Sequence, residues 1–290
     1  MIDDILKIRF DRYTPTNDIE QENMLKETMQ HYILASLSKH GLFTEAIFHG
    51  GTCLRIVNGI ARFSEDLDFL LKVPDAGFKW QTYLDHVQKD CAGEGIEFES
   101  VNRDSCKTTV RKAFLKTDSV GSLLTFRFPF GRHKARKIRV KLEIDTNPPA
   151  GSSIETAYLM FPRPEPLTIQ TLESGFALKL HALLCRPYIK GRDWYDFLWY
   201  VARMICPDIN LLANALFQQG PWAGCSLNVT HAWLAIELSK KIDSIDWALA
   251  RSDVQRFLSH SEQDALRNWE GAMFKYNVTQ LCEYAARKTE

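Results

Sequence analysis

The amino-acid sequence predicts an α+β fold, in which a mixed β-sheet with flanking helices is followed by an all-helical C-terminal half. Apolar residues recur at helical spacing from Met24 to Leu37. β-branched, aromatic and basic residues alternate between Ile96 and Asp145, as expected for three or four strands. After Pro166 the pattern is helical almost to the end of the chain.

The expected elements of the first half follow from start and stop signals along the chain. Thr16-Asn17-Asp18 marks a helix start, and Gly41 can end that helix. The next elements are a strand at 45–49, a helix at 52–58 that stops at Gly59, a strand at 66–71 and an amphipathic helix at 78–92. Prolines between 148 and 166 predict a long irregular connection. We therefore expect an α/β domain over residues 1–165 and a helical domain over residues 166–290.

The composition is that of an ordinary globular protein that can bury its own core. The 290 residues are 45% hydrophobic and 25% charged, with a formal net charge of +0. The seven cysteines include no Cys-x-x-Cys pair, which disfavours a disulfide framework or structural zinc site and fits a reducing cytosol. The acidic N-terminal segment does not resemble a signal peptide, and no apolar run is long enough to span a membrane. We expect a cytoplasmic protein without a membrane partner.

Asp66 and Asp68 stand on an otherwise apolar strand. Residues two apart in a strand point to the same face, so these side chains project together. Two carboxylates so close repel each other unless a positive group lies between them. Mg²⁺ commonly uses one or two carboxylates together with substrate phosphates. The pair therefore predicts a magnesium site, and the alternative is a solvated strand edge with two surface aspartates.

Glycines precede this pair in a position that suits phosphate. Gly50-Gly51-Thr52 follows a predicted strand and opens a predicted helix. Helix N-termini present N–H groups and partial positive charge, and glycine lets the backbone approach a ligand. Ser64, just before the aspartates, could also hold phosphate. A phosphate cradle followed by a metal-binding pair is what nucleotidyl or phosphoryl transfer requires.

The order of an apolar residue, GGTCLR (50–55), a short helix and RFSEDLDF (62–69) carries a specific resemblance. It resembles the motif of the DNA polymerase β-like nucleotidyltransferase superfamily. Within that superfamily it is similar to the AbiEii/AbiGii-type toxins of abortive-infection (phage-defence) and toxin–antitoxin systems. The resemblance implies a nucleotidyltransferase-like core, with Asp66 and Asp68 holding the metal. It also implies that the nucleotide is bound by Gly50, Gly51, Thr52, Arg55 and Ser64.

The resemblance further implies a third carboxylate on a central strand. In RVKLEID (139–145), Glu143 and Asp145 share a strand face with Lys141. Glu143 is preferred because it lies between Leu142 and Ile144, inside the apolar frame of the strand. Both acids remain candidates for the metal site.

A helical lysine followed by Arg-Asp-x-x-Asp is the second motif that the resemblance implies. Lys179 could reach a triphosphate as a point charge, and Lys190 and Arg192 precede the aspartates. Asp193 would be catalytic or would orient Lys179, with Asp196 as the second choice. The alternatives are an exposed helix lysine for Lys179 and an N-terminal helix cap for Asp193.

A local excess of positive charge lies between Arg103 and Lys141. Twelve Lys or Arg residues stand there against two acids, most densely in RHKARKIRVK (132–141). Such a patch favours a polyanion partner. The alternative is a solvated hairpin whose charges prevent edge aggregation. The resemblance makes RNA the preferred polyanion.

These interpretations predict a Mg²⁺-dependent toxin that transfers a nucleotide from a nucleoside triphosphate to an RNA acceptor. The first choice of acceptor is the 3′ end of tRNA, so that translation stops, and two metal ions could take part. A cognate antitoxin is the expected protein partner. The alternatives are nucleotidylation or phosphorylation of a protein, and a nucleotide-binding regulator without turnover. The candidate catalytic residues are Asp66, Asp68, Glu143, Lys179, Asp193 and Asp196.

Overall fold

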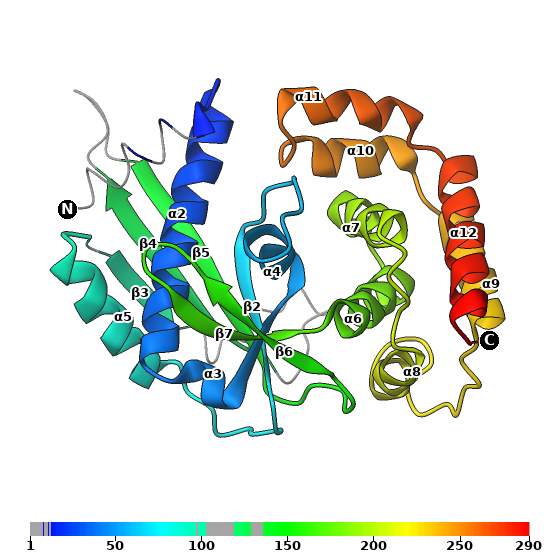
Figure 1. The fold of residues 1–290 in the computed structure, drawn as a ribbon, viewed down its shortest axis with the longest axis horizontal. Helices are drawn as coiled ribbons and strands as arrows, with labels where there is room; N and C mark the ends of the chain where they lie inside the picture. The colour runs from blue at the N-terminus through cyan, green and yellow to red at the C-terminus, as the bar shows by residue number, and fades with distance from the viewer. Residues whose placement is uncertain are drawn as a thin grey trace. The chain divides into compact units, whose positions relative to one another are not determined.

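The computed structural model of the chain describes residues 8, 11, 13–96, 98–102, 119–128 and 136–289. Its contacts divide the chain into two compact units. The first comprises residues 1–148 and 155–169, and the second comprises residues 149–154 and 170–290. The sheet belongs to the first unit, and the second unit is built of helices (Figure 1). The predicted α+β class is therefore confirmed.

A mixed sheet organises the first unit. Among the described residues it has seven strands in the order β3-β4-β5-β2-β1-β7-β6. β2 lies at the centre, antiparallel to β1 and parallel to β5. The strands are β1 (Ala46–His49), β2 (Asp66–Leu71), β3 (Phe98–Asn102), β4 (Ser119–Phe128), β5 (Arg136–Asp145), β6 (Ile154–Leu159) and β7 (Glu165–Gln170).

Helix α2 (Asp18–Lys39) packs across this sheet, against β5 and α5 (Figure 1). Its start is capped by Asn17, whose side chain accepts a hydrogen bond of 2.9 Å from the Glu20 N–H. After its end, Gly41 adopts φ of +83°, a conformation that glycine tolerates best. The other helices of the unit are α3 (Leu42–Glu45), α4 (Gly50–Ile56) and α5 (Gln81–Gly93).

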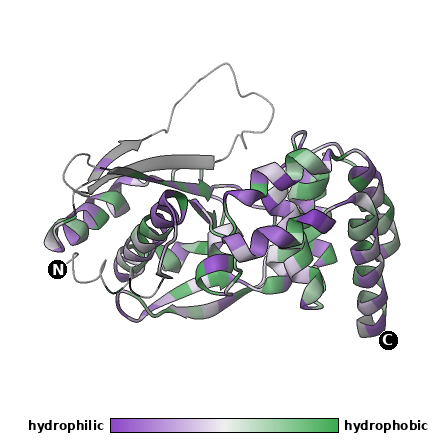
Figure 2. Cartoon of the chain, turned by 90° about the horizontal axis from the view of Figure 1, so that it is seen from above, coloured by the Kyte–Doolittle hydropathy of each residue, from purple (hydrophilic) through white to green (hydrophobic). Residues whose placement is uncertain are grey.

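The second unit buries a cluster of aromatic rings between its helices. Trp194 lies edge-on to Phe274 with ring centroids 5.3 Å apart, and Trp247 stacks on Phe274 at 4.1 Å. Figure 2 shows hydrophobic and hydrophilic residues interleaved around these helices, as amphipathic helices require. They are α6 (Leu172–Cys185), α7 (Gly191–Ala202), α8 (Ile209–Gln218), α9 (His231–Asp243), α10 (Trp247–Gln255), α11 (His260–Gln263), the 3-10 helix η1 (Asp264–Asn268) and α12 (Gly271–Thr289). Within the described ranges, no helix combines the length and apolar character that a membrane crossing demands.

Two expectations about local structure were wrong. The proline-rich connection contains β6 and the start of β7, and the rest of β7 lies after Pro166, where a helix was expected. β7 pairs in parallel with β1 through Phe48 and Ile169. That pairing joins residues about 120 positions apart, so a local pattern cannot reveal it. Helix α4 begins at Gly50, two residues before the expected start, because Gly50 turns the chain at once from strand into helix with φ of +78°.

Candidate active site

Strand β2 presents Asp66 and Asp68 on one face of the sheet. Both are half-buried, and they alternate with Leu67 and Phe69, which are buried in the core. The expected projection of the two carboxylates to a common face is therefore found. Two carboxylates must lie on the same face of the sheet if their oxygens are to bind one cation.

The neighbouring strands add two further side chains to this face. In the sheet register, Asp68 lies opposite His49 of β1 on one side and opposite Glu143 of β5 on the other. Residues directly opposite in a sheet point to the same face. Asp145, the alternative third carboxylate, lies opposite Leu70, is buried, and accepts a hydrogen bond of 3.1 Å from the Asn147 N–H. Glu143 is therefore the acid that adjoins the aspartate pair.

The first turn of α4 packs directly against these carboxylates. A Cβ atom added to Gly50 would lie 2.8 Å from Oδ2 of Asp68. A Cβ atom added to Gly51 would lie 2.6 Å from an amino group of Arg62 and 2.9 Å from Oγ of Ser64. All three distances are too short for a real Cβ atom, so only glycine allows this approach. Ser64 and the buried Arg62 therefore lie beside the turn that carries the two glycines.

The other two predicted nucleotide ligands of this unit make internal contacts. The buried Thr52 donates its hydroxyl to the backbone carbonyl of Asp66. Arg55 donates from Nε to Glu27 at 2.7 Å and from NH1 to the Ile60 carbonyl at 3.1 Å. These side chains fasten α4 to β2 and to α2.

Helix α2 also holds the loop that leads into β2. The fully buried Gln30 donates from Nε2 to the carbonyls of Ser64 and Glu65, at 3.0 and 2.9 Å. Lys26 forms an ion pair of 3.1 Å with Glu65. The sequence interpretation assigned no role to either residue of α2. The available signal was that polar residues interrupt the apolar run of this helix, at positions that prove to be buried.

The donor set suits Mg²⁺ through two carboxylates. The ion prefers oxygen ligands and uses one or two carboxylates with substrate phosphates and water. Asp66 and Asp68 supply those oxygens, and Gly50 leaves space beside Asp68 that a Cβ atom would fill. Glu143 is held in an ion pair with Lys141. Among the described residues, no group of three or more His, Cys, Asp or Glu side chains is arranged to hold a metal ion.

The second unit brings together the lysine and aspartates of the other predicted motif. Lys179 of α6 lies 2.8 Å from Oδ1 of Asp193 and 2.8 Å from Oδ2 of Asp196, both on α7. Arg186 lies 2.6 Å from Oδ2 of Asp193. The side chains of Lys179, Asp193 and Asp196 are 13%, 3% and 0% exposed. Lys179 is therefore a buried, paired cation and not an ordinary surface lysine.

Electrostatics favour the charged form of Asp193 within this Lys179 cluster (Lys179, Arg186, Asp193 and Asp196). Burial alone would raise the pKa of Asp193, but Lys179, Arg186 and Lys190 outweigh burial and hold that pKa well below its ordinary value. Burial lowers the pKa of the Lys190 ammonium. The N-terminus of α7 has no side-chain cap. Asp193 is therefore not the helix cap that was its alternative role, and its carboxylate forms the ion pairs with Lys179 and Arg186. The sequence interpretation missed Arg186, which only the fold brings to Asp193.

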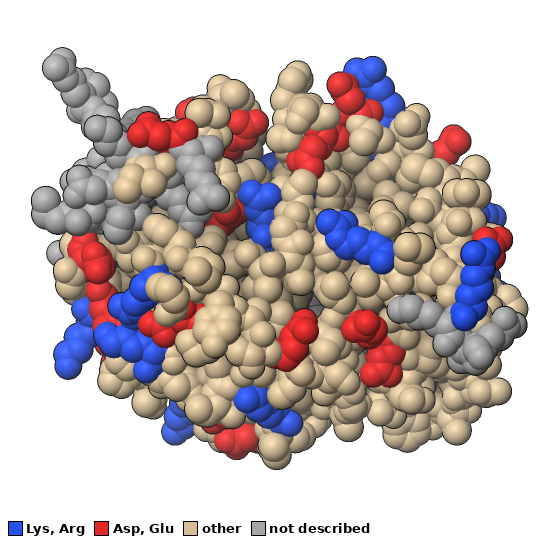
Figure 3. All heavy atoms as spheres, viewed as in Figure 1, with Lys and Arg blue, Asp and Glu red and all other residues tan. Residues whose placement is uncertain are grey.

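Most of the predicted basic segment lies outside the described residues. These are residues 103–118 and 129–135. On the face drawn in Figure 3, the coloured Lys and Arg side chains are interspersed with Asp and Glu. The prediction of a polyanion-binding surface therefore stays a prediction.

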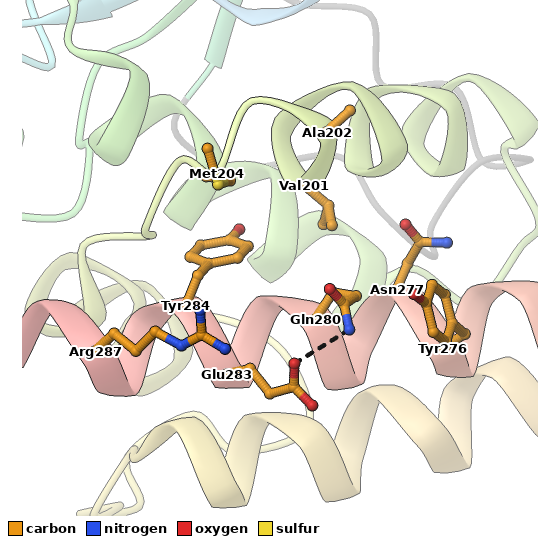
Figure 4. Close-up of a pocket in the computed structure, with 9 residues that line it drawn as sticks. All are labelled: Val201, Ala202, Met204, Tyr276, Asn277, Gln280, Glu283, Tyr284 and Arg287. Carbon is orange, nitrogen blue, oxygen red and sulfur yellow. Dashed lines mark hydrogen bonds between the residues drawn. The ribbon is translucent and has the colours of Figure 1, made fainter.

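A separate groove of about 250 Å³ lies in the second unit, at the C-terminal end of α7 (Figure 4). That end of α7 is roughly 14 Å along the helix from Asp193. The groove contains none of the predicted site residues. Its lining is Val201, Ala202, Met204, Tyr276, Asn277, Gln280, Glu283, Tyr284 and Arg287.

Comparisons with known proteins identify a family for the chain and solved structures with a similar fold. The family model described as nucleotidyl transferase AbiEii toxin, type IV TA system, matches residues 32–271. MenT4, a nucleotidyltransferase toxin of Mycobacterium tuberculosis H37Rv, has a similar structure with a TM-score of 0.53 and 19% identity, covering 95% of this chain and 98% of that chain. JHP933 from Helicobacter pylori gives a TM-score of 0.50 and 17% identity, covering 92% of this chain and 91% of that chain. No curated protein matches the sequence.

Proposed function

The chain belongs to the AbiEii family of nucleotidyltransferase toxins of type IV toxin–antitoxin systems, and from this premise we propose that it transfers a nucleotide from a nucleoside triphosphate to an RNA end, with tRNA as the acceptor. Membership makes it a nucleotidyltransferase and implies an antitoxin partner. The proposal adds the acceptor, the metal and the residues that act.

The observation that carries the proposal is the row of carboxylates beside the first turn of α4. Asp68 lies next to Glu143 in the sheet register, and Gly50 approaches Asp68 so closely that no side chain fits between them. Asp66 and Asp68 would hold Mg²⁺, and the backbone of Gly50 and Gly51 would approach the triphosphate. When bound there, Mg²⁺ supplies positive charge that offsets the negative charge gathering on the phosphate oxygens.

The reaction is an in-line displacement at the α-phosphorus. An oxygen of the acceptor hydroxyl forms a bond to the α-phosphorus, and the bond from that phosphorus to the bridging oxygen of the β-phosphate breaks. The hydroxyl proton passes to a carboxylate of the β2–β5 face, and pyrophosphate leaves. Little covalent work falls to the protein, so the residues act by positioning and by electrostatics.

Thr52 and Gln30 have positioning roles in this proposal. Thr52 donates a hydrogen bond to the backbone carbonyl of Asp66, and Gln30 donates hydrogen bonds to the carbonyls of the two residues before Asp66. Both contacts limit the movement of the strand that carries the carboxylates. Gln30 and Thr52 are fully buried, so neither side chain would touch the substrate.

Lys179 would neutralise charge on the triphosphate, and Asp193 and Asp196 would orient it. A lysine held by two buried carboxylates has its ammonium fixed in one place, which lowers the entropy that it loses on binding phosphate. This assignment rests on the family motif, and the test is whether Lys179 and the β2 carboxylates are needed for the same reaction.

The local charge supports a polyanion as the acceptor, and the family resemblance makes RNA the preferred polyanion. Twelve basic residues stand against two acids between positions 103 and 141, in a chain whose formal net charge is +0. Phosphate contacts of this kind supply affinity that falls with salt. We therefore expect RNA labelling by the protein to weaken steeply as the salt concentration rises.

A labelling experiment tests the proposal directly. The protein is incubated with Mg²⁺, total cellular RNA and each α-³²P nucleoside triphosphate in turn, and the products are separated on a denaturing gel. The variants are Asp66→Asn with Asp68→Asn, and Lys179→Met. Asp85→Asn is the matched control, because it makes the same change of an aspartate outside the proposed site. Asp85 lies on α5, and among the contacts described it accepts a hydrogen bond only from Gln81.

The proposal would be supported by label on a tRNA-sized band that is lost in both site variants and kept in Asp85→Asn. The nucleoside triphosphate that gives this label would identify the base. Label on protein alone would favour protein nucleotidylation. Nucleotide binding without release of pyrophosphate would favour a regulator without turnover. Either of these two results would overturn the RNA assignment.

A further inference from the structure

Lys141 of β5 lies on the same face of the sheet as the carboxylates. β2 and β5 run side by side in parallel (Figure 1), with Asp66 opposite Lys141 and Asp68 opposite Glu143. Directly opposite residues share a face, so four charged side chains form a two-by-two array. All four are partly exposed, while Leu67 and Leu142 between them are buried.

Lys141 interacts with each acid of this array. Its ammonium donates to Oε2 of Glu143 in an ion pair. The positive charge of Lys141 also interacts favourably with the carboxylates of Asp66 and Asp68. The ammonium therefore supplies the one positive charge among these four side chains.

We propose that Lys141 takes the place of a second metal ion, so that the site binds one divalent cation with its nucleotide. Three carboxylates and one ammonium leave two net negative charges, which a single Mg²⁺ neutralises. The ammonium engages Glu143, the acid that a second ion would need in addition to the aspartate pair. Two-metal sites place their ions about 3.5–4 Å apart, and a like charge within that array disfavours the second ion.

The inference rests on the proposed function, because it concerns the metal of the same site. It is tested by binding and not by turnover. Mn²⁺ replaces Mg²⁺, and α,β-methylene analogues of the four nucleoside triphosphates are used in turn. Equilibrium dialysis counts Mn²⁺ per chain, and electron paramagnetic resonance detects a spin-coupled Mn²⁺ pair.

The variants are Lys141→Met, which removes the charge, and Lys141→Arg, which keeps it. Lys39→Met is the matched control. Lys39 also belongs to the first unit, forms an ion pair with Asp90 at 2.8 Å, and is 46% exposed compared with 43% for Lys141. Circular dichroism melting curves check that each variant folds.

The expected result is one Mn²⁺ per chain for the wild type, Lys141→Arg and Lys39→Met. Lys141→Met is expected to bind a second Mn²⁺, to show a coupled signal, and to bind the first ion about tenfold more tightly. A coupled pair in the wild type would overturn the inference and leave the proposed function intact. A single ion in Lys141→Met would also overturn it, because the lysine would not be what excludes the second ion. No bound Mn²⁺ in any variant would remove the metal from the proposed function, and the inference with it.

Discussion

Replacing Asp193 by asparagine tests how the Lys179 cluster is held together. Asn keeps the size of the side chain but removes its charge, which leaves Lys179 and Arg186 without the carboxylate that contacts both at 2.8 and 2.6 Å. The Asp193 side chain is only 3% exposed, so water cannot compensate. Breaking a buried pair by removing one partner costs roughly 3–5 kcal/mol. At roughly 4 °C per kcal/mol for a unit of this size, the melting temperature should fall by about 12–20 °C.

Asp243→Asn is the control for this measurement. Asp243 lies in the same unit and forms an ion pair of 2.6 Å with Lys275, but the two side chains are 64% and 44% exposed. An exposed pair contributes less than about 1 kcal/mol. Urea unfolding followed by tryptophan fluorescence reports on the second unit, because Trp194 lies in its core. Equal destabilisation by Asp193→Asn and Asp243→Asn would refute the argument from burial.

The pH dependence of the stability difference between wild type and Asp193→Asn gives a second test of the Lys179 cluster. Burial would raise the pKa of Asp193, but Lys179, Arg186 and Lys190 lower it overall. A lowered folded-state pKa means that the stabilisation is complete above the unfolded-state pKa of about 3.9 and is lost as the pH falls toward the folded-state pKa. The free-energy difference between wild type and Asp193→Asn should therefore be constant from about pH 8 to pH 5. A difference that disappears within that range would contradict the assignment.

Three further substitutions test the packing around the carboxylates. Gly51→Ala should destabilise the first unit by about 1–3 kcal/mol in thermal melts, because the new Cβ atom would lie 2.6 Å from Arg62. The control is Gly93→Ala on α5, which should be neutral or stabilising because its Cβ atom would meet nothing within 4 Å. Gln30→Leu should lower the free energy of unfolding in urea by about 1–3 kcal/mol and lower kcat, because two partly buried carbonyls lose their donor. An unchanged kcat would show that this contact does not position β2. Thr52→Val should lower kcat about fivefold, because it loses one hydrogen bond of about 1 kcal/mol to the β2 backbone. KM should change less, and Thr52→Ser, which keeps the hydroxyl, should restore kcat.

The sequence was sufficient for the local part of the site. Strand periodicity placed Asp66 and Asp68 on one face and identified the bounds of β2 as 66–71, which is what the structure has. Helical spacing and Asn17 located α2. These features depend on residues within a few positions of one another, where propensity and periodicity act directly.

Long-range pairing was beyond the same reasoning. The choice of Glu143 over Asp145 had only the apolar frame of one strand to support it, whereas the register of β5 against β2 puts Glu143 beside Asp68 and buries Asp145. Sequence patterns also missed β7, since it pairs in parallel with a strand far away in the chain.

What the sequence by itself determined is the chemistry of the parts: a carboxylate pair on a strand, glycines at a helix start, and a lysine followed by two aspartates. What only the tertiary structure decided is which charges meet. Lys141 and Glu143 come to lie opposite Asp66 and Asp68, and Arg186 joins Lys179 at Asp193. The physical reason is that Coulombic energy depends on distance and burial, and the packing of strands and helices sets both.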